Sequence, residues 1–188
     1  MSFDLARSLR RFKPGRHTAR LIRRPDEELP FVSERPFGGS ELLLDTCVYI
    51  DVLQHRAPEE IKSLLKVRLI SHSGVALAEL THLFGRLDPQ DDRTGRVLAE
   101  ISGLISDMPE HRLAAPSLNV QGEAGILAGL VVRLARMESG PEQALLNDAT
   151  LYLQAVAQGQ MMLTRNVREF DWFDQILPSN RVLFYRQT

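Results

Sequence analysis

Three acidic residues and one asparagine stand where their side-chain oxygens could bind a metal ion. Asp45 ends the apolar run ELLLD, Glu79 lies within VALAELTHL, Asp148 lies within LLNDATLYLQ, and Asn166 follows MMLTR. Carboxylates are costly to bury without a cation, and a cluster of them repels itself unless a divalent ion neutralises it. Hard oxygen ligands select Mg²⁺ or Mn²⁺ over zinc. The pattern therefore predicts an acidic pocket that holds Mg²⁺ or Mn²⁺.

Asp148 gives the strongest single signal. A helical rotation of about 100° per residue places it on the apolar face of its helix. Leu145, Leu151, Tyr152, Ala155 and Val156 share that face, whereas Gln143, Asn147, Thr150, Gln154 and Gln158 lie on the other side. The carboxylate is thus predicted to point into the protein, where it needs either a buried arginine or a metal ion.

The other residues have simpler interpretations when each is taken alone. Asp45 could cap a helix that begins near Cys47. Glu79 could extend to solvent or pair with Arg86, and Asn166 is a common turn residue. The metal-site hypothesis depends on all of them meeting in one place.

The predicted elements could bring them together. Short apolar runs at 41–45, 68–73, 111–117, 160–164 and 181–185 predict strands. Helical patterns cover 47–54, 58–66, 74–87 continuing through 92–108 as far as Pro109, 119–139, the segment with Asp148, and 167–176. Ser139 and Glu142 fit a capping box for the helix of Asp148. This alternation predicts an α/β fold, a three-layer α/β/α sandwich around a mostly parallel sheet, with ligands beyond the carboxyl ends of the strands.

Composition limits the class of protein. The 188 residues include one cysteine, which excludes an intramolecular disulfide and a multi-cysteine zinc site. No apolar run reaches the roughly 18 residues of a membrane span, and the basic N-terminus does not resemble a signal peptide. The five histidines lack metal-ligand spacing, and neither GxSxG nor a phosphate-binding glycine loop is present. We expect a soluble, cytoplasmic protein without a membrane partner.

The N-terminal segment differs in charge from the rest. Residues 1–24 hold 8 of the 23 Lys and Arg but only Asp4 of the 24 acids. Residues 25–40 contain three prolines and a Gly-Gly pair, which predicts a linker. We therefore divide the chain into a basic arm with its linker at 1–40 and a domain at 41–188. The arm could follow a phosphate backbone, dock on an acidic surface of its own body or of a partner, or remain solvated.

The ordered set of motifs resembles the PIN-domain ribonucleases, and among them the VapC-type toxins of bacterial toxin–antitoxin pairs. The likeness covers about residues 41–188 and is carried by LLLDTCVYIDVL, VALAEL, NDATLYLQAVAQGQMMLTRNVREF and RVLFY. It implies a PIN-like fold, cleavage of RNA with Mg²⁺ or Mn²⁺, restraint by an antitoxin protein, and assembly as a homodimer.

The resemblance also implies roles for particular residues. Asp45, Glu79 and Asp148 match the family's acidic metal ligands, and Asn166 falls where the family has Asp or Asn. Thr46 is retained beside Asp45, and Glu169 stands where many members have a further acid. By position, Thr164 and Arg165 flank the site, and Arg165 could either offer a cation to a scissile phosphate or form an ordinary surface salt bridge. Cys47 stands where Ser or Asn is usual. That departure, together with Asn166, leaves open an alternative, a catalytically inactive PIN-like module that binds RNA or a protein partner.

Overall fold

The computed structural model describes residues 3–32, 39–137 and 142–187. Within these ranges five short strands form one sheet in the order β3-β2-β1-β4-β5, and each neighbouring pair is parallel. The strands are β1 (Leu42–Leu44), β2 (Ile70–Ser73), β3 (Leu113–Ala114), β4 (Met161–Thr164) and β5 (Val182–Phe184). The predicted strands are confirmed, each somewhat shorter than its apolar run. Because β1 and β4 are neighbours at the centre, the residues after them lie side by side.

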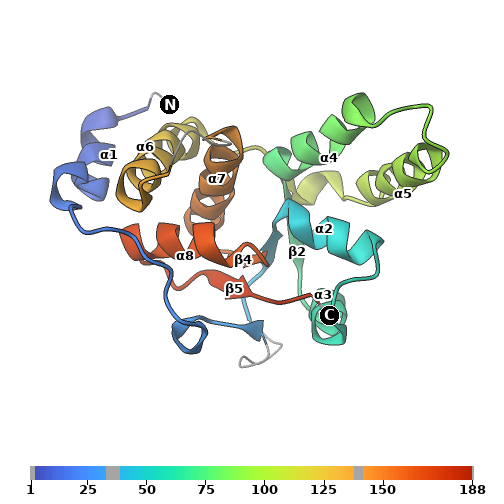
Figure 1. Ribbon diagram of the computed structural model, residues 1–188, viewed down its shortest axis with the longest axis horizontal. Coiled ribbons are helices and arrows are strands. Elements are labelled where there is room, and N and C mark those ends of the chain that lie inside the picture. Colours follow the sequence, from blue (N-terminus) through green and yellow to red (C-terminus); the bar gives the residue numbers. More distant parts are fainter. Residues whose placement is uncertain (1–2, 33–38, 138–141, 188) are drawn as a thin grey trace.

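Helices cover both faces of the sheet, which confirms the predicted three-layer sandwich (Figure 1). Leu42 and Leu44 point to one face and Leu43 to the other, as alternation along a strand requires. The face of Leu42 packs against α2 (Thr46–Leu53), α3 (Glu59–Val67), α4 (Gly74–Arg86) and α5 (Thr94–Ser106). The face of Leu43 packs against α1 (Leu5–Phe12), α6 (Leu118–Ala135), α7 (Glu142–Gln158) and α8 (Val167–Ile176).

Two details of the helices differ from the sequence-based predictions. The helix expected to continue from 74 to 108 is two helices, because Leu87 has an extended backbone and Pro89 cannot continue a helix. On α7, Thr150 and Gln154 are buried rather than solvent-facing. Gln154 accepts a hydrogen bond from Ser73 at 2.7 Å and donates one to the carbonyl of Ala114 at 3.0 Å. The capping box at Ser139 lies outside the described residues.

The described part of the N-terminal segment packs on the body. Phe12 of α1 and Phe31 belong to the same core cluster as α6 and α8, and Phe31 forms a parallel bridge with Phe184. The segment also contains two 3-10 turns, η1 (Pro14–Arg16) and η2 (Asp26–Glu28). Of the uses predicted for the arm, docking on its own body is therefore observed. The core reaches beyond residues 41–188, and the division at residue 40 stays a prediction about independent folding.

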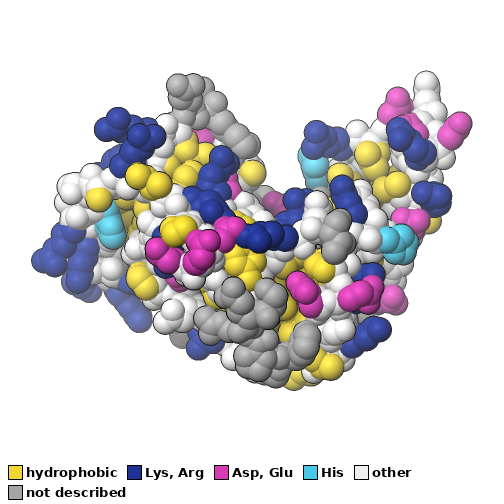
Figure 2. Space-filling view, turned by 60° about the horizontal axis from the view of Figure 1, so that its bottom comes forward, with side chains coloured by type: hydrophobic (Ala, Val, Ile, Leu, Met, Phe, Trp, Pro, Cys, Tyr) yellow, Lys and Arg dark blue, Asp and Glu magenta, His cyan; other side chains and the backbone are white. Residues whose placement is uncertain are grey.

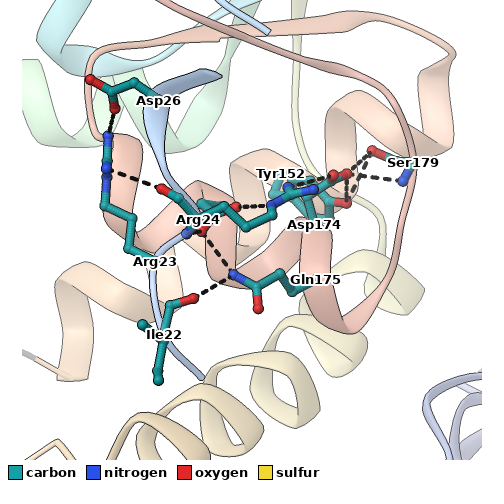
Figure 3. Close-up of polar contacts among 9 residues, drawn as sticks. Ile22, Arg23, Arg24, Asp26, Tyr152, Asp174, Gln175 and Ser179 are labelled. Carbon is teal, nitrogen blue, oxygen red and sulfur yellow. Dashed lines mark hydrogen bonds and ion pairs between the residues drawn. The ribbon is translucent and has the colours of Figure 1, made fainter. Parts of the chain in front are cut away.

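An ion pair between a partly exposed arginine and a buried carboxylate fixes the arm to α8 (Figure 3). Asp171 is fully buried, and Arg24 donates to it from its backbone N at 2.9 Å and from Nε at 2.6 Å. The same guanidinium reaches Asp174 at 3.2 Å. Gln175 donates to Asp171 and to the carbonyl of Ile22. The carboxylate therefore receives a cation from a residue far away in the sequence.

In the part of the chain that the structure describes, no helix is long and apolar enough to cross a membrane.

Candidate active site

The candidate site begins at the carboxyl ends of the two central strands. Asp45 follows β1, and Thr164 is the last residue of β4. The backbone N–H of Asp45 donates to Leu163 at 3.1 Å, which fixes the two strand ends to each other. Asp45 occupies the N-cap position of α2, but its side chain makes no capping hydrogen bond. The capping role that Asp45 could have had is therefore not the one it performs, and its carboxylate is directed elsewhere.

The Asp45 carboxylate is held by neutral donors. Its Oδ2 accepts hydrogen bonds from the Thr164 hydroxyl at 2.6 Å and from the Cys47 thiol at 3.0 Å. Asp45 is only 5% exposed. Burial raises the pKa of Asp45 above its usual range, and the negative charge of Glu79 raises it further, while these two hydrogen bonds oppose the shift. The side chain is thus a buried acid with a fixed orientation and no cation among these donors.

Glu79 reaches the same place from α4. Its Oε2 accepts a hydrogen bond from the Thr46 hydroxyl, and its Oε1 accepts one from Asn147 Nδ2 at 2.6 Å. Neither solvent nor Arg86 supplies these contacts, so the simpler interpretations of Glu79 are not observed. Thr46 follows directly after Asp45, and Asn147 directly precedes Asp148. Glu79 therefore connects the loop after β1 to the beginning of α7.

Asp148 completes the group from α7. It is partly buried, and its Oδ2 accepts a hydrogen bond from Asn166 Nδ2 at 2.9 Å. Burial raises the pKa of Asp148 to about 9, and the negative charges of Asp45, Glu79 and Glu169 add to the shift. The hydrogen bond from Asn166 acts in the opposite direction. Asp148 therefore lies close enough to Asp45, Glu79 and Glu169 to be affected by their charges, and the role of these acids as metal ligands stays a prediction.

The flanking residues divide into two kinds. Thr164 also accepts a hydrogen bond from the backbone N–H of Asn166 at 2.9 Å, so its hydroxyl connects Asn166 to Asp45. Glu169, in contrast, has a cation of its own, because Arg168 Nη2 lies 2.5 Å from its carboxylate. Glu169 is therefore less available to a metal ion than the other three acids.

Asp51 is a residue that the sequence reasoning missed. It is fully buried on α2 and receives Arg165 Nε at 2.9 Å, the Tyr185 hydroxyl at 2.7 Å and Gln187 Nε2 at 2.6 Å. Arg165 follows β4 and is 40% exposed, so Asp51 forms a salt bridge with a partly exposed arginine at the end of that strand. An acid inside the apolar run CVYIDVL is the same signal that identified Asp148, and it would have identified Asp51.

The acids lie beside a hollow in the surface. A cleft of about 550 Å³ is lined by Gly74, Val75 and Ala78 of α4, by Ala115, Pro116 and Gln121, and by Leu146, Asn147 and Thr150 of α7. Figure 2 shows the molecule hollowed between the end that carries α1 and the end that carries α5. Asn147 lines the cleft and donates to Glu79. An extended ligand in this cleft would thus pass close to the acidic group.

The donor set fits a hard divalent cation in kind but is not assembled around one. All the candidate ligands are oxygens, and the hydrogen-bond donors of Asp45, Glu79 and Asp148 are hydroxyl, thiol and amide groups without charge. Among the described residues, no group of three or more His, Cys, Asp or Glu is arranged so that it could hold a metal ion. Binding would therefore require some of these carboxylates to turn from their present donors.

Comparison with known proteins identifies similar folds but no similar sequences. No family model and no curated protein matches the chain. Its structure is similar to a chain of VapBC2 from Rickettsia felis bound to a DNA fragment from their promoter, at 15% identity and a TM-score of 0.53 over 79% of this chain and 99% of that one.

Two further structures give the same result. A chain of DNA-bound VapBC from Salmonella typhimurium is 23% identical with a TM-score of 0.52, covering 77% of this chain and 97% of that one. A chain of FitAcB from Neisseria gonorrhoeae is 18% identical with a TM-score of 0.56, covering 77% and 96%. These likenesses concern the fold, and the chain has the PIN-like three-layer α/β/α fold that its sequence predicts.

Proposed function

We propose that this chain is a metal-dependent endoribonuclease that hydrolyses RNA phosphodiester bonds and acts as the toxin of a toxin–antitoxin pair. The observation that carries the proposal is the group of Asp45, Glu79 and Asp148 at the carboxyl ends of the central strands, with neutral partners only. In a parallel sheet this edge is where ligands bind. The similarity to chains of VapBC complexes supports the toxin assignment.

In this proposal Asp45, Glu79 and Asp148 hold Mg²⁺ or Mn²⁺. Such an ion, when bound, lowers the pKa of a water molecule and stabilises negative charge on the phosphodiester. Thr164 and Cys47 fix the orientation of Asp45, and Asn166 fixes that of Asp148. Instead of binding the metal, Glu79 could act as the general base that accepts a proton from the attacking water. The role of Asn166 is therefore to position an acid rather than to supply charge.

Arg165 is suited to contact the phosphate. The salt bridge from its Nε to the buried Asp51 fixes the plane of the guanidinium, and the side chain is 40% exposed directly after Thr164, the hydrogen-bond partner of Asp45. A planar guanidinium presents its remaining N–H groups as a fork that matches two phosphate oxygens. Arg165 would thus bind the strand while the acids hold the metal.

Metal titration with an RNA substrate tests the enzyme assignment. We expect cleavage that requires Mg²⁺ or Mn²⁺, stops with a chelator, and is lost in Asp148→Asn. The matched control is Glu142→Gln, an exposed acid on the same helix, which should cleave normally. Cleavage by Asp148→Asn in the presence of chelator would exclude the metal mechanism.

The alternative function is a catalytically inactive PIN-like module that binds RNA or a protein partner. Cys47 beside Asp45, Asn166 beside Asp148 and the lack of a preformed metal cage among the described acids favour it. The same titration separates the two, because an inactive module would bind RNA without cutting it in either metal. Retained binding with no cleavage by the wild-type chain would select the alternative.

The proposed partners follow from the toxin assignment. We expect an antitoxin protein that restrains the nuclease, and a homodimer as the assembled form. Expression of the wild-type chain in a bacterial host should arrest growth, and Asp148→Asn should not. Light scattering of the purified chain reads the oligomeric state, and a monomeric mass would reject the dimer. We also expect the protein to act in the cytoplasm, where its RNA substrate is.

A further inference from the structure

The cations of the N-terminal segment are used in two different ways. Arg11 pairs with Glu123 on α6, Arg24 pairs with Asp171 and Asp174 on α8, and Arg23 pairs with the neighbouring Asp26. The first two of these arginines attach the segment to the body. The remaining cations are exposed, and no described residue forms an ion pair with them: Arg7, Arg10, Lys13, Arg16 and Arg20.

The end of α6 adds two more cations to the same region. Arg133 Nη2 donates to the carbonyl of Pro14 at 2.8 Å, and the backbone N–H of Leu21 donates to Leu134 at 3.2 Å. Arg136, in the left-handed conformation, ends the helix at this point. We call the exposed cations of the segment together with Arg133 and Arg136 the arm surface. Figure 2 shows Lys and Arg side chains gathered at the end of the molecule that α1 occupies.

The arm surface is fixed in place rather than carried on a free tail. Phe12 is 1% exposed in the core cluster that contains α6, and Ser8 donates to Glu123 at 3.0 Å. Arg7 and Arg10 therefore project from a helix that is attached to the body on its other side. A solvated tail would place its charges at random, whereas this segment holds them together on one surface.

Several positive side chains fixed on one surface can bind a polyanion whose negative charges are regularly spaced. Guanidinium groups form paired hydrogen bonds to phosphate, and each phosphate contact releases bound counterions. The two sites use different parts of the chain, because the arm surface is formed by residues 7–20 and the end of α6, whereas Asp45 precedes α2 and the other two acids lie on α4 and α7. A long RNA could occupy both, since contacts to phosphate hold a strand without reading its sequence.

We propose that the arm surface is a second RNA-binding site, which contacts the phosphate backbone of the strand away from the acidic site. The choice of RNA as the polyanion rests on the proposed function. The surface increases the affinity for long RNA relative to oligonucleotides too short to span both sites.

The test is the salt dependence of RNA binding by the full-length chain. Binding of a single-stranded RNA is measured in chelator, without divalent metal, so that cleavage does not interfere. The variant carries Arg7→Gln, Arg10→Gln, Arg16→Gln and Arg20→Gln. The control for net charge carries Lys62→Gln, Lys66→Gln, Arg93→Gln and Arg96→Gln. These remove the same formal charge from α3, α5 and the residue before α5, although Lys62, Arg93 and Arg96 pair with acids. A double variant, Arg7→Gln with Arg10→Gln, serves if the fourfold variant shows a weakened thermal transition.

For the fourfold variant, we expect the slope of log affinity against log salt to become shallower by up to about 2.8, at about 0.7 for each phosphate that the surface no longer neutralises. The double variant should give up to about half of that change, and the control should keep the wild-type slope. An unchanged slope in the variants, or an equal change in variant and control, would overturn the proposal and leave an acidic protein partner as the use of the surface.

This outcome is separable from that of the proposed function. If the variant has a shallower salt dependence of RNA binding but the wild-type chain never cuts RNA in Mg²⁺ or Mn²⁺, the second binding site is supported and the nuclease assignment is rejected. A chain that cuts RNA while variant and wild type share one slope gives the reverse result.

Discussion

Asp171 beneath the N-terminal segment and Asp45 after β1 are both buried acids, but the charges of their partners differ. Asp171 receives the guanidinium of Arg24 and an amide of Gln175. Asp45 receives a hydroxyl and a thiol, and its neighbours Glu79 and Asp148 add negative charge instead of removing it. A buried carboxylate with its own cation stabilises a docking contact. Carboxylates that share a site without a cation leave negative charge uncompensated, and in the proposed function a metal ion would compensate it.

Removing Arg24 is the strongest way to break this comparison. Arg24→Ala would leave the fully buried Asp171 without a cation. Loss of one partner costs about 3–5 kcal/mol when both are buried, and because Arg24 is 32% exposed and two other donors to Asp171 remain, we expect about 2–3 kcal/mol. Chemical denaturation measures the free energy of unfolding. Arg20→Ala, an exposed cation of the same segment, is the control and should change it by about 0.5 kcal/mol or less. Equal, small effects of both substitutions would show that the segment is not held by this pair.

The contrast between the two acids also shows what the sequence could predict. Asp45 and Asp148 are recognisable because each follows or interrupts a local apolar pattern, and the parallel sheet then brings such residues to one edge. Arg24 and Asp171 lie 147 residues apart, and nothing in the local pattern of either one indicates the other. Long-range partners of this kind are set by tertiary packing alone.

The packing of the N-terminal segment on the body was also not predictable from local sequence. Phe12, Leu29 and Phe31 are buried, but they are scattered among arginines, prolines and acids that predict a solvated arm and linker. On α7 the periodicity predicts a polar face that includes Gln154. The helix is covered more completely than a surface helix, and Gln154 finds its partners on Ser73 and Ala114 inside the protein. Local periodicity cannot show how many neighbours a helix has.

A smaller effect is expected from the hydroxyl that orients Asp45. Thr164→Val keeps the shape of the side chain and removes its hydrogen bonds to Asp45 and Asn166. Partners that orient metal ligands are typically worth about 10–100-fold in metal affinity or activity. We expect the proposed RNA cleavage to fall by that factor, with a higher concentration of Mn²⁺ needed for half-maximal rate. Thr164→Ser restores the hydroxyl and should restore most of the activity, whereas a purely structural role would leave the metal requirement unchanged.

The smallest effect, and the one that separates the two kinds of acid most directly, is the pH dependence of stability without metal. The pKa of Asp148 in the folded chain is about 9, far above that of an aspartate in an unfolded chain. Between about pH 4 and pH 9 the folded state therefore holds a proton that the unfolded state releases, and stability contributed by this group is lost as pH rises.

The prediction compares the wild-type chain with Asp148→Asn in chelator at pH 5 and pH 8. The wild type should lose about 1 kcal/mol more than the variant over this range, because Asp148 is partly exposed and water screens much of the shift. Mn²⁺ should raise the stability of the wild type at pH 8, since an ion that binds only the folded state stabilises it, and should do little for the variant. If the two chains instead follow one pH profile and respond equally to Mn²⁺, Asp148 resembles Asp171, an acid already neutralised by the fold, and the contrast between the two regions fails.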